Sequence, residues 1–283
     1  MRIEHEAVIL AAGRGSRLGE RTGDTPKSLL PIGPRSKSDP SETSFLRRQV
    51  ELLRAEGVER IAVVVGYRKE QLIDALRSFD LRVEIVVNEW PNISESGSLH
   101  SFQYAARSGY LGGTRMTLLL DADIVYERRA LTRFLDAPPL SAAMIAPRHI
   151  SDDAEQVLVY GPAYAPRYLG KGLTPELVEG LPCLGEATGI VKLAPHDHAL
   201  ARRAMDWMLG DPDAPASSLH HRGFGPARKA TEHEELTGRL MRLGVMSGVV
   251  LDREVLFMEV DNAAEYAVLR GELYPRVLER EGA

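Results

Sequence analysis

The chain is poor in cysteine. Its 283 residues include only Cys183, which cannot form an internal disulfide and has no second thiol with which to build a zinc site of the usual spacing. Such scarcity is typical of proteins kept in a reducing compartment. We therefore expect a cytoplasmic protein.

Long apolar runs and an excess of basic residues are also missing. The apolar run at residues 7–12 is too short for a membrane span and lacks the features of a signal peptide, so we expect a first β-strand there and no membrane partner. The 35 basic and 40 acidic residues give a formal net charge of -5. Because a nucleic-acid backbone usually requires a basic excess, we expect no nucleic-acid partner, whereas a small anionic ligand is compatible with this charge.

Short apolar runs alternate with segments of helical period in the first half. Runs rich in Val, Ile and Leu predict strands buried on both faces, at residues 7–10, 61–65, 83–87 and 116–120. Apolar spacing predicts helices between them, around residues 45–53, 72–76 and 99–105. This alternation favours βαβ units with right-handed crossovers. We expect an α/β fold with a doubly wound, mainly parallel sheet.

The pattern loosens after about residue 146. Strands are predicted around residues 157–160 and 189–193, helices around 200–208 and 234–243, and a strand pair near Val249 and Phe257. This indicates an α+β, lid-like second half. No linker rich in Pro and Gly separates the halves, so we expect one domain over residues 1–283, with a polar solvent loop at 34–43.

A glycine-rich segment, LAAGRGSRLGERTGDTPKSLLPIG at residues 10–33, follows the first predicted strand. It is not a Walker A loop, because Glu20 follows Gly19 where Lys and Ser or Thr are needed. A dinucleotide fingerprint starting at Gly13 would need Gly or Ala in place of Leu18. Both of these familiar interpretations therefore fail.

The same segment can cradle a triphosphate. Its glycines let backbone N–H groups approach phosphate oxygens. Arg17 can bind a phosphate with two parallel hydrogen bonds, and Lys27 adds a point charge. The predicted phosphate-binding residues are Ala12, Gly13, Gly15, Ser16, Arg17 and Lys27. The alternative is an ordinary turn with two solvated cations.

Two acidic clusters can hold a metal ion. Asp121 and Asp123 follow the predicted strand at 116–120, at the edge where open α/β sheets bind ligands. Oxygen ligands of this kind suit Mg²⁺. A second cluster contains Asp261, although Asn262 with Glu265 three residues later is also a helix-capping pattern. Either cluster could instead be a turn or a cap.

These segments resemble the signature of the nucleotidyltransferase superfamily, which includes sugar-1-phosphate nucleotidyltransferases and the choline-phosphate, phosphonate and inositol-phosphate cytidylyltransferases. The resemblance implies a GT-A-like fold and Mg²⁺ as the cofactor. By position, it implies Asp123 and Asp261 as metal ligands, with Asp121 in support. It also implies that Arg17 and Lys27 are the catalytic cations that neutralise the departing pyrophosphate.

No protein base is required by such a reaction. An acceptor phosphate or phosphonate oxygen is already ionised near neutral pH, so it can attack the α-phosphorus directly. The 8 histidines are therefore left without catalytic roles.

Three further strings resemble the cytidylyltransferase branch. Residues 88–99 place Asn88 and Ser98 near the nucleotide. The string at 185–192 matches a G-E-x-x-G-I-x-K strand, and Glu234 with Glu235 falls where that branch often has an acidic pair. The candidates for acceptor contact are Glu186, Lys192 and Glu234. Surface pairing of Glu186 with Lys192 and a solvated acidic helix face are open alternatives.

The resulting hypothesis is a cytidylyltransferase that transfers CMP from CTP to a phosphonate or small alcohol phosphate and releases pyrophosphate. Residues 1–146 would bind the nucleotide and residues 147–283 the acceptor. The alternatives are a sugar-1-phosphate nucleotidyltransferase using UTP, dTTP or GTP, and a nucleotide-sensing binding module. Trp90, Tyr160 and Tyr164 favour a cationic acceptor, whereas the basic stretch at 220–229 favours an anionic one. The sequence is compatible with a homodimer.

Overall fold

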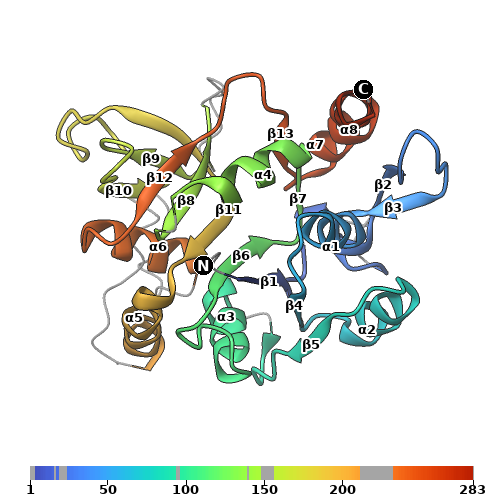
Figure 1. Ribbon diagram of the computed structural model, residues 1–283, viewed down its shortest axis with the longest axis horizontal. Helices are drawn as coiled ribbons and strands as arrows, with labels where there is room; N and C mark the ends of the chain where they lie inside the picture. Colours follow the sequence, from blue (N-terminus) through green and yellow to red (C-terminus); the bar gives the residue numbers. More distant parts are fainter. Residues whose placement is uncertain are drawn as a thin grey trace.

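A nine-stranded sheet forms the centre of the molecule, in the order β10-β9-β11-β6-β1-β4-β5, with β8 joined to β11 and β12 (Figure 1). The computed structural model describes residues 4–15, 17–18, 24–93, 96–138, 140–147, 156–210 and 232–282. The strands of this sheet are β1 (His5–Ala11), β4 (Arg60–Val65), β5 (Glu84–Val87), β6 (Met116–Asp121), β8 (Ala142–Ala146), β9 (Leu158–Tyr160), β10 (Tyr168–Gly170), β11 (Cys183–Leu193) and β12 (Ser247–Val250).

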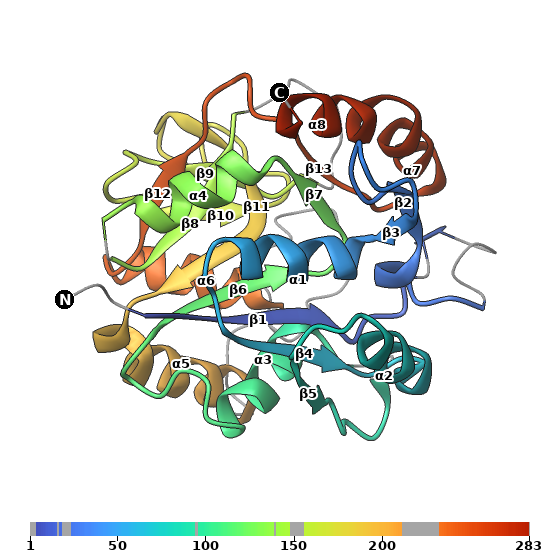
Figure 2. The same cartoon turned by 45° about the vertical axis from the view of Figure 1, so that its right-hand side comes forward.

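The first half of the chain forms a parallel, doubly wound layer. β1 pairs in parallel with β4 and β6, and β4 with β5. Helices cover both faces of these strands, namely α1 (Phe45–Ala55), α2 (Lys69–Ser78), α3 (Ser98–Arg107), α4 (Arg128–Asp136) and α5 (His198–Gly210). Ala7 and Ile9 pack in the core with α1, α2 and α4, whereas Val8 and Leu10 pack with α3 and α5 (Figure 2). The expected fold class is confirmed.

The second half extends the same sheet. Its long strand β11 runs antiparallel to β6, β8 and β9. The expected pairing near Val249 and Phe257 is wrong: β12 pairs with β8, and β13 (Phe257–Glu259) pairs with β7 (Ile124–Tyr126). The strand β8, which the sequence pattern did not reveal, supplies the edge for β12. The pairing of β13 with β7 brings the two acidic clusters of the sequence together.

Smaller elements surround this sheet. They are the hairpin of β2 (Pro31–Pro34) and β3 (Glu42–Ser44), the helix α6 (His233–Arg242), and the C-terminal helices α7 (Ala263–Val268), η5 (Leu269–Leu273) and α8 (Tyr274–Glu281). The connection between β2 and β3 is formed by residues 35–41 of the polar stretch, whose ends belong to the two strands. Ser44 then caps α1, because its Oγ accepts a hydrogen bond from the Arg47 backbone N at 3.3 Å.

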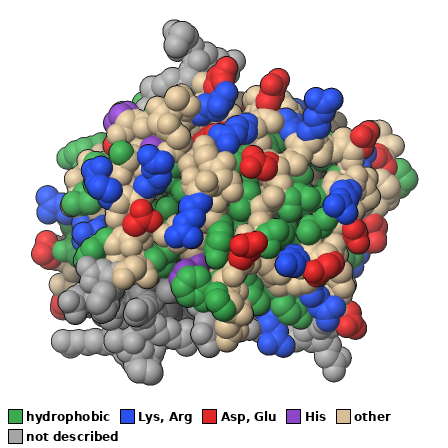
Figure 3. Space-filling view, turned by 90° about the horizontal axis from the view of Figure 1, so that it is seen from below, with side chains coloured by type: hydrophobic (Ala, Val, Ile, Leu, Met, Phe, Trp, Pro, Cys, Tyr) green, Lys and Arg blue, Asp and Glu red, His purple; other side chains and the backbone are tan. Residues whose placement is uncertain are grey.

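The surface in Figure 3 carries basic and acidic side chains interspersed with one another. No helix among the described residues is long and apolar enough to cross a membrane.

Candidate active site

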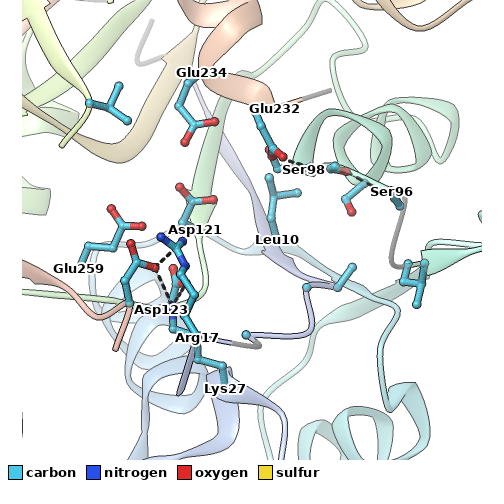
Figure 4. A pocket seen from close by; sticks show the side chains of 18 of the residues that line it. Leu10, Arg17, Lys27, Ser96, Ser98, Asp121, Asp123, Glu232, Glu234 and Glu259 are labelled. Carbon is cyan, nitrogen blue, oxygen red and sulfur yellow. Dashed lines mark hydrogen bonds and ion pairs between the residues drawn. The ribbon is translucent and has the colours of Figure 1, made fainter. Parts of the chain in front are cut away.

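A cavity of about 730 Å³ lies at the carboxyl ends of β1 and β6, between the two halves of the chain (Figure 4). The first half contributes the glycine-rich loop, Asp121 at the end of β6, and Asp123. The second half contributes Lys171, Glu234, Glu259 and Asp261. The cavity is therefore placed where open α/β sheets bind ligands.

The glycine-rich loop is shaped by contact with Lys27. Gly15 has φ +62°, and a Cβ on it would lie 2.8 Å from the Lys27 Cβ, so both the backbone angle and the close approach require glycine here. The Leu18 backbone N donates to the Gly15 carbonyl at 3.1 Å and closes a turn. Ala12, Gly13 and Gly15 all line the cavity. Ser16 lies outside the described residues.

Lys27 connects this loop to the acidic clusters. Its Nζ donates to Asp123 Oδ2 at 2.5 Å and to Asp261 Oδ1 at 3.3 Å. Burial lowers the pKa of Lys27, but the two carboxylates outweigh it, and the net pKa is raised. Arg17 Nη2 lies 2.9 Å from the same Asp261 oxygen. The two predicted catalytic cations thus meet at the two predicted metal ligands.

A third carboxylate, Glu259, completes this cluster. Carboxylate oxygens of Asp123, Glu259 and Asp261 lie within 4.8 Å of one another. Glu259 pairs with Ile124 in the β13–β7 ladder, which places it beside Asp123. Burial and the neighbouring carboxylates raise the pKa of Glu259 well above its usual value. Three hard oxygen donors this close together fit Mg²⁺. The signal for Glu259 in the sequence was its position two residues before Asp261.

The capping alternative for this segment is also correct. Asn262 Oδ1 accepts hydrogen bonds from the Ala264 and Glu265 backbone N atoms, both at 3.0 Å. Glu265 Oε2 accepts in return from the Asn262 backbone N at 3.2 Å. Because these two side chains cap α7, the Asp261 carboxylate is left to face the cavity.

A second group of titratable side chains begins beside this cluster, at Asp121, and continues along the cavity to the start of α6. His233 Nε2 is 2.9 Å from Asp121 Oδ2 and 3.6 Å from Glu234 Oε2. Burial lowers the pKa of His233, but Asp121 and Glu234 reverse the effect and raise it to about 10. Burial raises the pKa of Glu234 to about 7, against the pull of His233. We refer to Asp121, Glu232 and Glu234 as the acidic wall.

The remaining member of the wall, Glu232, contacts the start of α3. Its Oε2 accepts from the Ser98 backbone N at 3.0 Å and from Ser98 Oγ at 2.6 Å. Ser98 lines the cavity. The other residue predicted from that string, Asn88, is buried and orders the loop instead, because its Nδ2 donates to Ser96 Oγ at 2.8 Å and to Ser101 Oγ at 3.0 Å.

Two of the predicted acceptor contacts need correction. Lys192 is 1% exposed, and its Nζ donates to the Phe134 and Ala137 carbonyls, both at 2.9 Å, at the end of α4. It is thus directed away from the cavity, because its place on β11 turns it toward that helix. Glu186 accepts from Gln156 Nε2 at 3.2 Å and does not line the cavity either. Glu234 does line it.

The aromatic box for a cationic acceptor is not assembled among the described residues. Trp90 contacts the His100 ring at a centroid distance of 4.1 Å and lines a different cavity. Tyr164 is 83% exposed. The basic stretch at 220–229 lies outside the described residues.

The phosphate loop and the facing carboxylates on this sheet define the class of nucleotidyltransferases. The chain belongs to the family described as MobA-like NTP transferase domain, which matches residues 7–176, more than half of the 283 residues. The expected membership in the nucleotidyltransferase superfamily is confirmed.

Two relatives carry names that concern amino-bearing phosphonates. The chain is 33% identical over 138 residues to a CMP-5'-(3-aminopropyl)phosphonate synthase from Streptomyces rubellomurinus, covering 48% of this chain and 20% of that protein. It is 29% identical over 119 residues to a 2-aminoethylphosphonate cytidylyltransferase from Lancefieldella rimae, covering 42% of this chain and 43% of that protein. The matched part spans less than half the length of each.

The fold is similar to that of the CTP:phosphocholine cytidylyltransferase from Streptococcus pneumoniae. The TM-score is 0.65 over 95% of this chain and 98% of that one, with 18% sequence identity. At this identity the likeness shows the fold alone.

Proposed function

We propose that this protein is a Mg²⁺-dependent cytidylyltransferase. It transfers CMP from CTP to a phosphonate or small phosphate monoester that carries an ammonium group, and it releases pyrophosphate. The observation that carries this proposal is a single cavity with a phosphate loop and a carboxylate cluster on one side and the acidic wall on the other. The chain acts as one domain, with the nucleotide bound by residues 1–146 and the acceptor by residues 147–283 together with Asp121.

The groups on the nucleotide side of the cavity neutralise the negative charge of the triphosphate. Backbone N–H groups at Gly13 and Gly15 face the triphosphate, and Arg17 and Lys27 attract the β- and γ-phosphates. Asp123, Glu259 and Asp261 would hold Mg²⁺, which supplies positive charge at the α-phosphate when bound. Lys27 is 7% exposed. Its burial strengthens its electrostatic attraction for the phosphates, because little water surrounds the charge.

The reaction is an in-line displacement. An ionised acceptor oxygen attacks the α-phosphorus of CTP and forms the new P–O bond, while the bond to the bridging oxygen breaks and its electron pair leaves with pyrophosphate. The proton balance needs no base, so the residues act by orientation and by electrostatic stabilisation.

The acidic wall supports an acceptor with a positive charge. The Glu234 Oε2 atom is buried and finds no hydrogen-bond partner within the part of the chain that the structure describes. An ammonium group placed there would satisfy it with a charge-assisted bond. Lys171 lines the same cavity and offers a cation for the acceptor's phosphonate. The names of the two relatives point to acceptors of this chemistry.

A pyrophosphate-release assay over pairs of substrates tests the proposal. CTP, UTP, dTTP, GTP and ATP are each combined with 2-aminoethylphosphonate, phosphocholine, inositol 1-phosphate and glucose 1-phosphate in the presence of Mg²⁺. We expect the fastest release from CTP with an amino-bearing acceptor, and the largest thermal shift from CTP. If UTP or dTTP with glucose 1-phosphate is faster than every CTP pair, the sugar-nucleotide alternative replaces the proposal. Nucleotide binding without release from any pair would indicate the sensing module.

A further inference from the structure

His233 connects α6 to two elements of the other half of the chain. It is the first residue of α6 and is 1% exposed. Its Nε2 lies 2.9 Å from Asp121 Oδ2 at the end of β6, and its backbone N donates to Ser98 Oγ at 2.8 Å at the start of α3. The start of α6, which carries Glu232 and Glu234 into the cavity, is therefore fixed at two points.

The carboxylate of Asp121 is confined from the opposite side by Gly189. This glycine has φ +70° on β11, and a Cβ built on it would lie 2.3 Å from Asp121 Oδ2. The carboxylate thus occupies the space that a side chain would fill. Gly189 and His233 both approach Asp121 Oδ2 and restrict the position of this carboxylate, which lines the cavity near the carboxylates of Asp123, Glu259 and Asp261.

The charge of the imidazole matters as much as its position. Asp121 from β6 and Glu232 and Glu234 from the start of α6 are the charged groups that act on it. Together they keep the ring protonated, with a pKa of about 10. Without the positive charge of the imidazole, the negative charges of the three carboxylates in the acidic wall would repel one another.

We propose that His233 is a positioning residue that holds the acidic wall around the acceptor by binding Asp121. It does not contact the substrate. Its loss therefore weakens acceptor binding and leaves nucleotide binding largely intact. The kinetic part of this inference rests on the proposed function, whereas the protonation of the ring can be measured on the free protein.

Two variants separate the effect of the hydrogen bond to Asp121 from the effect of the charge of the His233 ring. His233→Leu removes both, and His233→Gln keeps a neutral donor that reaches Asp121. We expect His233→Leu to raise the acceptor KM about tenfold or more, as for groups that orient a ligand-binding side chain, with the KM for CTP changed by about twofold or less. His233→Gln should recover part of this loss. His198→Gln is the matched control, because His198 is also 1% exposed and is the first residue of α5.

Nitrogen NMR of histidine-labelled protein gives the second readout. The signals of His233, assigned by their loss in His233→Gln, should be those of an imidazolium at pH 8, whereas burial lowers the pKa of His198 and keeps its ring neutral. Asp121→Asn should lower the pKa of His233. A neutral His233 at pH 7, or an acceptor KM in His233→Leu no different from that in His198→Gln, overturns the inference. Absence of turnover in the unmodified protein would overturn the proposed function alone, since the NMR measurement needs no substrate.

Discussion

The two sides of the cavity balance their negative charges in different ways. On the metal side, Asp123 and Asp261 contact Lys27 and Arg17, which come from the phosphate loop and are themselves suited to bind an anion. On the acceptor side, the charge of Asp121 is balanced by His233, a buried residue that has no access to the cavity. The balancing cations Arg17 and Lys27 line the cavity on the first side, whereas His233 on the second side does not. Of these two sides, the first therefore places its balancing cations where a ligand in the cavity can meet them.

The strongest test of the metal side is Asp261→Asn. A neutral amide cannot replace the carboxylate charge that holds the cation, so we expect pyrophosphate release to fall on the order of 10³-fold. Asp252→Asn, which alters an exposed aspartate paired with Arg133, should leave the rate within about twofold. Circular dichroism is used to check that both variants fold. Near-normal turnover in Asp261→Asn would remove it from the metal site.

A second test of the metal side concerns the loop cation. Lys27→Ala should lower pyrophosphate release on the order of 10²-fold, because a preorganised charge at the departing phosphates is lost. Lys37→Ala is the matched control, since Lys37 is exposed and its Nζ contacts the Glu279 carbonyl at 3.3 Å. Assays at equal concentrations of folded protein compare them. Similar losses at both positions would exclude Lys27 from the reaction.

The metal side was largely predictable because its residues lie in short, continuous strings. The glycine-rich loop from Gly15 to Lys27 follows β1, and Asp121 and Asp123 lie at the end of β6. The apolar pattern identifies both strands. The strand alternation also predicted the parallel layer correctly. Glu259 was overlooked although it lies only two residues before Asp261, at the end of β13.

The acceptor side was not predictable in the same way. His233 and Asp121 are separated by 112 positions, and only the tertiary fold, which places the first residue of α6 at the end of β6, brings them together. The strand–helix pattern of the second half did not predict which strands pair with β11, or which of its side chains face the cavity. Lys192 was therefore expected at the cavity, whereas its side chain contacts the end of α4. The residues next to His233 in the sequence do not indicate that its side chain contacts Asp121.

The pH dependence of acceptor binding tests the acidic wall. Glu234 has a pKa of about 7, so it is mostly neutral at pH 6 and mostly ionised at pH 8. We expect the KM for 2-aminoethylphosphonate to be roughly tenfold higher at pH 6 than at pH 8, following the ionised fraction. Glu234→Gln should raise this KM at pH 8 and flatten its pH dependence, which separates the effect from titration of the phosphonate itself. An unchanged pH profile in Glu234→Gln would remove this residue from ammonium binding.

The smallest expected effect on turnover belongs to Lys192→Met, and it separates a residue that supports the fold from those that line the cavity. The Lys192 ammonium is buried and satisfies the Phe134 and Ala137 carbonyls at the end of α4. Methionine keeps the apolar stem but leaves these acceptors without a partner, so we expect the free energy of unfolding to fall by about 1–3 kcal/mol. Because the group points away from the cavity, the acceptor KM at a temperature well below the transition should change by about twofold or less. Chemical denaturation and steady-state kinetics on the same preparation measure both quantities. A large rise in acceptor KM with unchanged stability would return Lys192 to the acceptor site and contradict its place in this comparison.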